Sequence, residues 1–366
     1  MHINIRVLLA AALMPAVLTG CFESTPCSSS LVRSGEADAS SVFSSCSGKA
    51  RDGDAIAQNN LGDFYYYGLG VPKDVPAALE WYRKAALQGE SDAILRLGEM
   101  YYSGKDVSQD YIEAEKWYRM GAERGLLMAQ EKLGDIYYEG LGVRQDYAEA
   151  MRWYLRASGP EDPAGKRAFE TDESFAHARF RLGEMYYYGR GTAQDYREAA
   201  RWFSLSAKGF NADAAGMLGD MYYNGLGVPQ NYAKAAEWYH AASLPPKGKA
   251  GARYKLGLMY YNGMGVAQNY IAAGNWFLFA AIDGNAEAQV MLGVMYCSGV
   301  GRDQSYSEAA EWFRKAEDQG NAVAQNNLGV LYENGAGVPM DKNAALSWYR
   351  ASCSRGYQKA CDNLRR

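Results

Sequence analysis

Residues 55–86 read AIAQNNLGDFYYYGLGVPKDVPAALEWYRKAA, and the pattern of this stretch recurs eight times along the chain. Its Trp81 lies 19 residues after Gly62, the glycine of a Leu-Gly pair, and every tryptophan of the protein keeps this distance from such a glycine. Successive tryptophans are 36, 36, 49, 36, 38, 36 and 36 residues apart. A near-constant period of this length predicts a solenoid, in which each repeat buries its apolar face on its neighbours. The eight tryptophans are Trp81, Trp117, Trp153, Trp202, Trp238, Trp276, Trp312 and Trp348.

Each repeat contains two helical patterns. The first is Ala-x3-Leu-Gly-x2-Tyr, as in Ala57, Leu61, Gly62 and Tyr65, and its spacings place the apolar side chains on one stripe. We expect its glycine to lie where a neighbouring helix comes close. The second pattern sets the tryptophan between two small residues, which indicates a bulky ring packed against a neighbour. A Gly-x-Gly loop separates the two helices, and a helix-capping residue such as Asp74 stands seven residues before each tryptophan.

These residues resemble the Sel-one-like repeat, a relative of the tetratricopeptide repeat, over roughly Ala55 to Arg350. The resemblance implies an all-α fold, a right-handed α-solenoid of eight helix-turn-helix repeats whose first helices line a concave face. It also implies the binding of proteins or peptides rather than catalysis.

The eight repeats, residues 55–351, are expected to lie between two capping helices. Residues 39–54 align with a second helix that has Ser45 in place of tryptophan, and residues 352–366 begin a further first helix. Atypical end repeats shield the apolar ends of a solenoid. Extra residues lengthen the period twice, within Gly159–Phe175 and near Pro245–Gly248. We expect both insertions to form surface loops.

The first residues predict export and a lipid anchor. Arg6 precedes the apolar run Val7–Val17, which is too short to span a bilayer. The segment Leu18-Thr19-Gly20-Cys21 resembles a bacterial lipobox, in which a peptidase cuts before the cysteine and the thiol carries diacylglycerol. Phe22, which is not Asp, resembles an outer-membrane address. We therefore expect a signal peptide at 1–20, a lipidated Ser-rich tether at 21–38 and a location on the bacterial outer membrane facing the periplasm; a plain secretory leader is the alternative.

Five cysteines remain besides Cys21, in a compartment that permits disulfides. A cysteine-rich branch of the family bridges helices at the spacing of Cys353 and Cys361, so the resemblance implies this disulfide. Cys27 and Cys46 could link the tether to the N-terminal cap. Cys297 stands where earlier repeats have tyrosine, and we interpret it as a free, partly buried thiol, with an intermolecular bridge as the alternative.

An acidic and aromatic stripe follows the first helices. One residue after the Leu-Gly glycine the first five repeats are acidic, and four residues after it the first six have tyrosine, so both positions share a face. By the resemblance these positions line the concave groove, and we predict that the stripe binds a basic or mixed extended segment. The alternative is that the rings pack between repeats and the acids face solvent. The stripe comprises Asp63, Tyr66, Glu99, Tyr102, Asp135, Tyr138, Glu184, Tyr187, Asp220, Tyr223 and Tyr261.

The composition and motifs give little support to an enzyme. The formal net charge of −4 argues against nucleic acid as a partner, and we expect no cofactor and no metal. His177 and His240 lie in different repeats without nearby ligands, so we interpret them as structural or exposed. Some cysteine-rich relatives are linked to β-lactam binding, but the chain has no Ser-x-x-Lys motif, and a β-lactam-binding or hydrolysing enzyme stays the weaker alternative.

The resulting prediction is a noncatalytic scaffold of the bacterial envelope that binds a protein partner in its concave groove. Three settings fit the family. The first is an immunity protein that neutralises an effector of type VI secretion, for example a phospholipase. The others are an adaptor for envelope assembly or polysaccharide export, and a virulence factor that binds host proteins.

Overall fold

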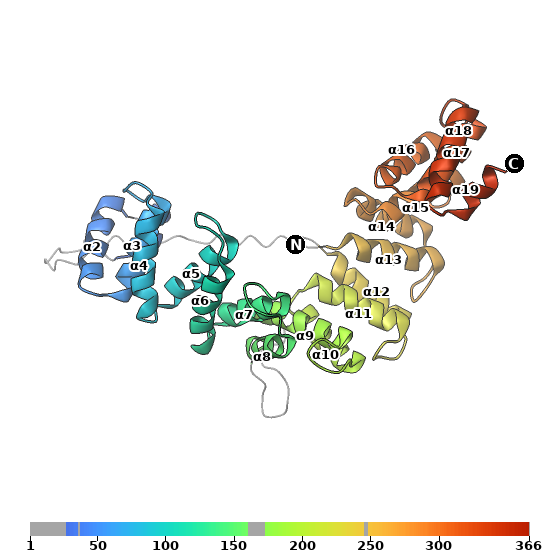
Figure 1. The fold of residues 1–366 in the computed structure, drawn as a ribbon. Helices are drawn as coiled ribbons and strands as arrows, with labels where there is room; N and C mark the ends of the chain where they lie inside the picture. Colours follow the sequence, from blue (N-terminus) through green and yellow to red (C-terminus); the bar gives the residue numbers. More distant parts are fainter. Residues whose placement is uncertain (1–26, 36, 160–172, 245–247, 366) are drawn as a thin grey trace, which may run out of the picture. The chain divides into compact units, whose positions relative to one another are not determined.

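The computed structural model describes residues 27–35, 37–159, 173–244 and 248–365 (Figure 1). All regular elements in these ranges are helices, and the ranges contain no strand, which confirms the predicted all-α class. No helix among the described residues is long and apolar enough to cross a membrane. The chain divides into two compact units, one ending at Gln109 and the other beginning at Asp110. Cys21 and most of both insertions lie outside the described residues.

The described residues of the first unit form the helices α1 (Ser29–Arg33), α2 (Ala39–Arg51), α3 (Ala55–Tyr67), α4 (Val75–Leu87) and α5 (Ser91–Ser103). The helices α2, α3, α4 and α5 pack on one another in chain order, and α1 contacts both α2 and α3. Thus α2 covers the free side of the first complete repeat.

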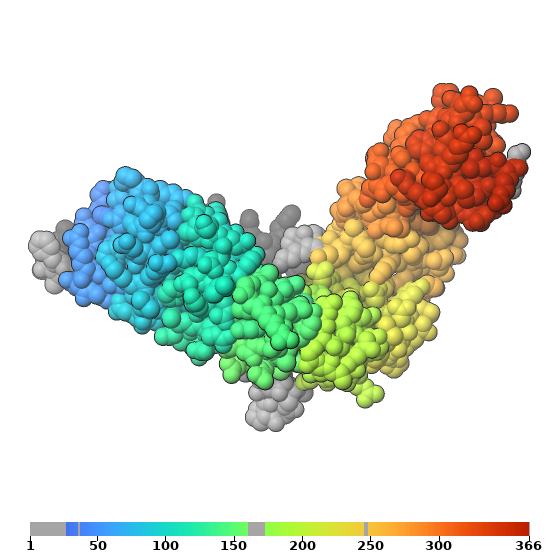
Figure 2. Space-filling view, in the orientation of Figure 1, coloured from blue at the N-terminus to red at the C-terminus, as the bar shows by residue number. Residues whose placement is uncertain are grey.

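The second unit continues the same alternation of first and second helices, again with each helix packed on the next. Figure 2 shows the atoms of this unit following one another in chain order, coloured from green to red. Its helices are α6 (Tyr111–Glu123), α7 (Leu127–Glu139), α8 (Tyr147–Ala157), the short 3-10 helix η1 (Glu173–Phe175), α9 (Ala176–Tyr188), α10 (Tyr196–Lys208), α11 (Ala212–Asn224), α12 (Tyr232–Ser243), α13 (Ala250–Asn262), α14 (Tyr270–Ile282), α15 (Ala286–Ser298), α16 (Tyr306–Glu317), α17 (Ala322–Asn334), α18 (Lys342–Ser354) and α19 (Gln358–Asn363).

The predicted capping signals set the helix ends. In α4 the side chain of Asp74 accepts a hydrogen bond from the Ala77 backbone N–H, which satisfies a donor that the first turn leaves free. In α3 the helix ends at Gly68, which has the left-handed φ of +69°. The second glycine of the loop allows a close approach between repeats, since a Cβ on Gly227 would stand 2.2 Å from the backbone oxygen of Tyr196. No side chain fits there.

The ring that packs on the Leu-Gly glycine follows the tryptophan by one residue. A Cβ on Gly183 would stand 2.5 Å from Cδ1 of Phe203, so the glycine makes room for this ring. The expectation that the glycine faces a neighbouring helix is right, and the ring that meets it belongs to the residue after the tryptophan. Trp117, Trp153, Trp202 and Trp312 are buried, while the other four are half-buried. The ring that follows the tryptophan is buried in all eight repeats: Tyr82, Tyr118, Tyr154, Phe203, Tyr239, Phe277, Phe313 and Tyr349.

The predicted tether is wrong for its described part. Residues Ser29–Arg33 form α1, and the buried hydroxyl of Ser29 donates a hydrogen bond to Asp63 at 2.6 Å. A disulfide joins Cys27 to Cys46 of α2, and a second joins Cys353 to Cys361. The segment therefore packs on the first repeat, because a covalent bond and a buried polar contact hold it there. At the other end α18 continues to Ser354, three residues past the boundary expected at 351.

Candidate partner-binding surface on the first helices

In the first, third and fifth repeats the acid after the Leu-Gly glycine connects the two helices of its repeat. The hydroxyl of Tyr82 in α4 donates to Oδ1 of Asp63 in α3 at 2.8 Å. In the third repeat the hydroxyl of Tyr154 donates to Asp135, also at 2.8 Å. The glycine and the acid next to it therefore hold the same side chain, because the glycine leaves space for the ring and the acid accepts a hydrogen bond from its hydroxyl.

A cation from the next repeat completes this contact. Arg96 of α5 lies 3.1 Å from Asp63. Arg181 of α9 lies 3.7 Å from Asp135, and Lys255 of α13 lies 2.5 Å from Asp220. Each of these cations stands two residues before its own Leu-Gly glycine, so the same register recurs. The acids are thus engaged in contacts between successive repeats.

His177 joins the contact around Asp135 from α9. Its Nε2 lies 3.0 Å from Oδ1 of Asp135. Burial opposes the charged imidazole, but the hydrogen bond with Asp135 and the charges of Asp135 and Glu131 outweigh it and raise the pKa of His177 above its usual 6.5. Burial alone would raise the pKa of Asp135, yet His177, Tyr154 and Arg181 lower it. His177 therefore has a structural partner.

These contacts correct part of the predicted stripe. Asp63 and Asp135 are buried, with 2% and 9% of their surface exposed, so the prediction that they present free carboxylates to a partner is wrong. Tyr138 is buried as well. Helix periodicity places the acid on the correct face, but the phenol and the cation that reach it come from other helices. The remaining stripe residues keep accessible surface: Glu99 is exposed, and Tyr66, Tyr102, Glu184, Tyr187, Asp220, Tyr223 and Tyr261 are half-buried.

The stripe tyrosines stack on the first residue of the second helix. The rings of Tyr187 and Tyr196 meet edge to face with centroids 5.1 Å apart, and Tyr261 meets Tyr270 in the same way. The pairs Tyr138–Tyr147 and Tyr223–Tyr232 repeat this arrangement. Tyr138, Tyr187 and Tyr261 also approach the buried aromatic residue of their repeats, as Tyr261 approaches Phe277 at 6.4 Å. These rings therefore close the space between the two helices.

Tyr66 in the first unit has a different partner. Its hydroxyl donates to Asp106 at 2.8 Å, and Lys73 lies 2.8 Å from the same carboxylate. Asp106 adopts a φ of +65° at the position where other repeats have the second loop glycine. Burial, followed by the hydrogen bond to Asp106, raises the pKa of Tyr66 to about 12.

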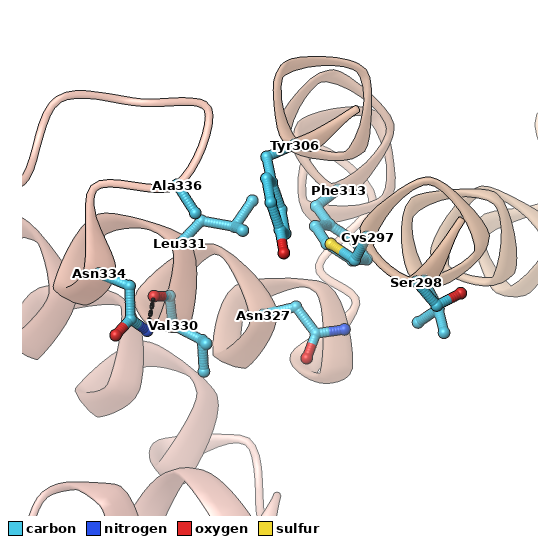
Figure 3. Close-up of a pocket in the computed structure, with 10 residues that line it drawn as sticks. Cys297, Ser298, Tyr306, Phe313, Asn327, Val330, Leu331, Asn334 and Ala336 are labelled. Carbon is cyan, nitrogen blue, oxygen red and sulfur yellow. Dashed lines mark hydrogen bonds between the residues drawn. The ribbon is translucent and has the colours of Figure 1, made fainter. Parts of the chain in front are cut away.

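The seventh repeat lacks the stripe ring. Cys297 occupies the tyrosine position, while Tyr306 still begins the second helix α16 and Phe313 still packs on Gly293. A cavity of about 490 Å³ opens beside them, lined also by Asn327 and Val330 of α17. Figure 3 shows Tyr306, Phe313 and Cys297 grouped across the cavity from Val330 and Leu331. None of its lining residues is Asp, Glu, Lys or Arg.

Cys297 itself is a free, half-buried thiol, as interpreted from the sequence. Burial raises its pKa, which disfavours the reactive thiolate. Sequence reasoning identified Cys297 as the exception in the stripe but did not find the cavity. The signal was the combination of a missing stripe tyrosine with a retained tyrosine nine residues later.

Comparisons with known proteins match this architecture along the chain. The sequence model of the Sel1 repeat matches residues 55–90, 91–126, 127–158, 176–209, 212–244, 250–285, 286–321 and 322–357. The chain belongs to the Sel1 repeat family. Sel1 repeat proteins are generally protein-interaction scaffolds, and the fold is typically non-catalytic. No curated protein matches the chain.

Two solved structures of Sel1 repeat proteins are similar to the chain. One is a protective antigen present in uropathogenic Escherichia coli strains, with 36% sequence identity and a TM-score of 0.79 over 88% of this chain. The chain spans 66% of that antigen's length. The other is a Sel1 repeat protein from Oxalobacter formigenes, with 30% identity and a TM-score of 0.68, covering 96% of this chain and 97% of that one.

Proposed function

We propose that this Sel1 repeat protein is a noncatalytic scaffold of the bacterial envelope that binds an extended segment of a partner protein on its first helices. The cavity beside Cys297 carries the proposal. It lies where six other repeats place an aromatic ring, and Tyr306 and Phe313 remain as its walls. An aromatic side chain of the partner fits there, since it restores the edge-to-face contact that Tyr261 and Tyr270 make one repeat earlier.

The surroundings of the cavity favour an uncharged anchor. A charged side chain would lose its hydration among Val294, Val330 and Leu331 without gaining an ionic partner. The amides of Asn327 and Asn334 at the cavity supply hydrogen-bonding groups suited to the backbone of an extended peptide. The Asn334 amide nitrogen already donates to the Val330 carbonyl at 2.8 Å, which leaves its oxygen as the acceptor for a partner N–H.

Binding of the partner is tested with Cys297→Tyr. This change places in the cavity the ring that six other repeats carry, so we expect it to preserve the fold and to weaken partner capture at least about tenfold, the effect of removing a central anchor pocket. Cys297→Ser leaves the cavity open and is the matched control. Peptides that differ only in one central residue should bind in the order Phe and Tyr, then Leu, then Asp and Lys. Equal binding by the Tyr and Ser variants would contradict the proposal.

We also propose that the chain is lipid-anchored through Cys21 on the outer membrane. The lipobox supports the anchor, and several acyl chains at ~0.8 kcal/mol per buried methylene give firm attachment. Cys21→Ser should release the protein from the membrane fraction with its melting temperature unchanged. The related E. coli chain is described as a protective antigen, which supports a location that antibodies reach. Protease treatment of intact cells distinguishes a surface-exposed protein from one that faces the periplasm.

The partner classes predicted above are separated by one capture experiment. The anchored chain is used as bait for periplasmic extract and for host proteins, with the Cys297→Tyr variant run in parallel. Retention of a toxic effector, with rescue of the poisoned cell by the chain, identifies an immunity protein. Retention of an export or assembly component identifies an adaptor, and retention of a host protein identifies a virulence factor. Only proteins lost with the tyrosine variant count as partners of the cavity.

A further inference from the structure

The cavity beside Cys297 is bordered by a second short side chain, which belongs to the loop of the eighth repeat. The middle residue of each loop between first and second helix stands seven residues after the Leu-Gly glycine. In the eighth repeat this residue is Ala336, and it lines the cavity. In the first seven repeats it is larger: Leu69, Lys105, Leu141, Arg190, Leu226, Met264 and Val300.

This loop residue can reach the stripe tyrosine of the preceding repeat. The hydroxyl of Tyr223 donates to the sulfur of Met264 at 3.9 Å, and Arg190 donates a hydrogen bond to the hydroxyl of Tyr138. In these two places a stripe ring and a loop side chain of the next repeat lie together on the first helices. Between repeats seven and eight both of these side chains are short.

The two short residues leave room for more than one aromatic ring. The cavity volume of about 490 Å³ lies within the ~300–1,000 Å³ of pockets that hold whole small molecules. Figure 3 shows Tyr306 between Ala336 and Cys297, so the short residues flank this ring on both sides. A ring placed beside Cys297 fills one of the two positions. The position beside Ala336 then still lacks the packing contacts that a larger side chain supplies.

We propose that the partner supplies two side chains to this cavity, an aromatic one beside Cys297 and an aliphatic one beside Ala336. The inference rests on the proposed function and names the segment that the cavity recognises. The chain itself shows what covers such a place, because Tyr223 and Met264 fill the equivalent position two repeats earlier. The second side chain is aliphatic, since the cavity contains Leu331 and no carboxylate that could pair with a base.

The two side chains belong to residues i and i+2 of an extended segment. Carbon atoms in contact are about 3.5–4.0 Å apart, so groups on opposite faces of one ring are about 7–8 Å apart. Residues i and i+2 point to the same face of a strand and are separated by about 6.6 Å, which suits two side chains on either side of Tyr306. Adjacent residues point to opposite faces. The cavity therefore selects an aromatic and an aliphatic residue separated by one residue.

The first test selects the segment from a display library of random peptides. The target is the full chain in detergent, and peptides that also bind the Cys297→Tyr variant are removed. The enriched peptides should share an aromatic and an aliphatic residue separated by one residue. Enrichment of peptides with an aromatic residue alone would overturn this inference and leave the proposed function in place. Absence of any enrichment over the tyrosine variant would overturn both.

The second test uses Ala336→Leu, which restores a larger loop side chain and leaves the position beside Cys297 open. A selected peptide is compared by fluorescence anisotropy with its version that has alanine for the aliphatic residue. The wild-type chain should bind the selected peptide at least about tenfold more tightly. The leucine variant should bind both peptides with the weaker affinity. Val300→Leu enlarges the same loop position one repeat earlier, outside the cavity, and should keep the tenfold difference.

Melting temperatures separate recognition from damage to the fold. Ala336→Leu fills an apolar space, so it should melt at or above the temperature of the wild type. If it melts lower, Ala336→Val takes its place, because valine is the residue that the seventh repeat carries here. A folded variant that keeps the tenfold preference would overturn the inference, and so would loss of the preference in Val300→Leu.

Discussion

The ring of Tyr239 lies directly against Gly219, so that a Cβ on the glycine would stand 2.6 Å from its Cδ1. The hydroxyl of the same tyrosine donates to Asp220, the next residue of α11, at 2.6 Å. Gly219 therefore packs against the ring of Tyr239, and Asp220 binds its hydroxyl, so that two neighbouring residues of the first helix position one side chain of the second helix. The arrangement recurs around Tyr82 and Tyr154, and it defines the packing unit of the fold.

Two alanine substitutions in α11 test this contact. Gly219→Ala should destabilise the protein by about 1–3 kcal/mol, because the added methyl overlaps the buried ring. Gly216 lies three residues earlier, and a Cβ added there would have Cβ of Ala242, 4.0 Å away, as its nearest neighbour. Gly216→Ala should therefore stabilise the protein by about 0.4–1 kcal/mol, because alanine has the better helix propensity. Urea unfolding of both variants gives the comparison. Similar effects of the same sign would show that the glycine is not a packing site.

The period of the tryptophans was sufficient to predict the helix pairs and their order, because a repeat can bury its apolar stripe only on its neighbours. Capping residues such as Asp74 and loop glycines such as Gly68 then placed the helix ends, since both act through local backbone chemistry. These features depend on residues close in the sequence. They could therefore be read from one repeat.

The candidate site depended on contacts across repeats, which spacing does not reveal. Asp63 belongs to the predicted face, but Arg96 from the next repeat and Tyr82 from the second helix reach it. Likewise, the sequence shows that Cys297 replaces a tyrosine, but only the structure shows that Tyr306 and Phe313 line the space that the tyrosine ring would fill. A sequence pattern gives the face of one helix, whereas these outcomes depend on which side chains of other helices meet that face.

The loss of stability caused by a tryptophan-to-alanine substitution should depend on how deeply the ring is buried. Trp202→Ala should cost about 3–5 kcal/mol, since its ring is 2% exposed and packs in a core with Leu182 and Met185. Trp276→Ala should cost less, because its half-buried ring leaves a space that water can enter. Thermal unfolding followed by circular dichroism measures both. A loss below about 1 kcal/mol for Trp202→Ala would contradict the core position.

Charge reversals distinguish structural acids from accessible ones. Asp63→Lys should destabilise the first unit by about 3–5 kcal/mol, because it places a cation against Arg96 and leaves the Tyr82 hydroxyl without its acceptor. Glu99→Lys alters an exposed side chain of the same unit and should change stability by less than about 0.5 kcal/mol. Amide hydrogen exchange of α3 to α5 reports the difference. Equal protection in the two variants would show that Asp63 is not a buried structural acid.

The contact between His177 and Asp135 predicts a pH-dependent joint between the third and fourth repeats. Because the folded-state pKa of His177 is raised, its stabilisation is complete below pH 6.5 and is lost as pH rises through the higher folded value. The facing groups are Glu131 and Asp135 of α7, Tyr154 of α8 and Arg181 of α9. The carboxyl of Asp135, whose pKa is lowered, loses its contribution only in acid, below its usual 3.8.

Stability should therefore fall between pH 6 and pH 8. The side chain of His177 is 44% exposed, so solvent screening limits the loss to about 0.5 kcal/mol. His177→Gln keeps a hydrogen-bond donor for Asp135 but cannot titrate, and it should abolish this slope. Urea unfolding at pH 6, 7 and 8 measures both chains. A stability that rises with pH in the wild type, or an equal slope in the variant, would contradict the assignment, because only protonation of His177 strengthens the contact with Asp135 in this window.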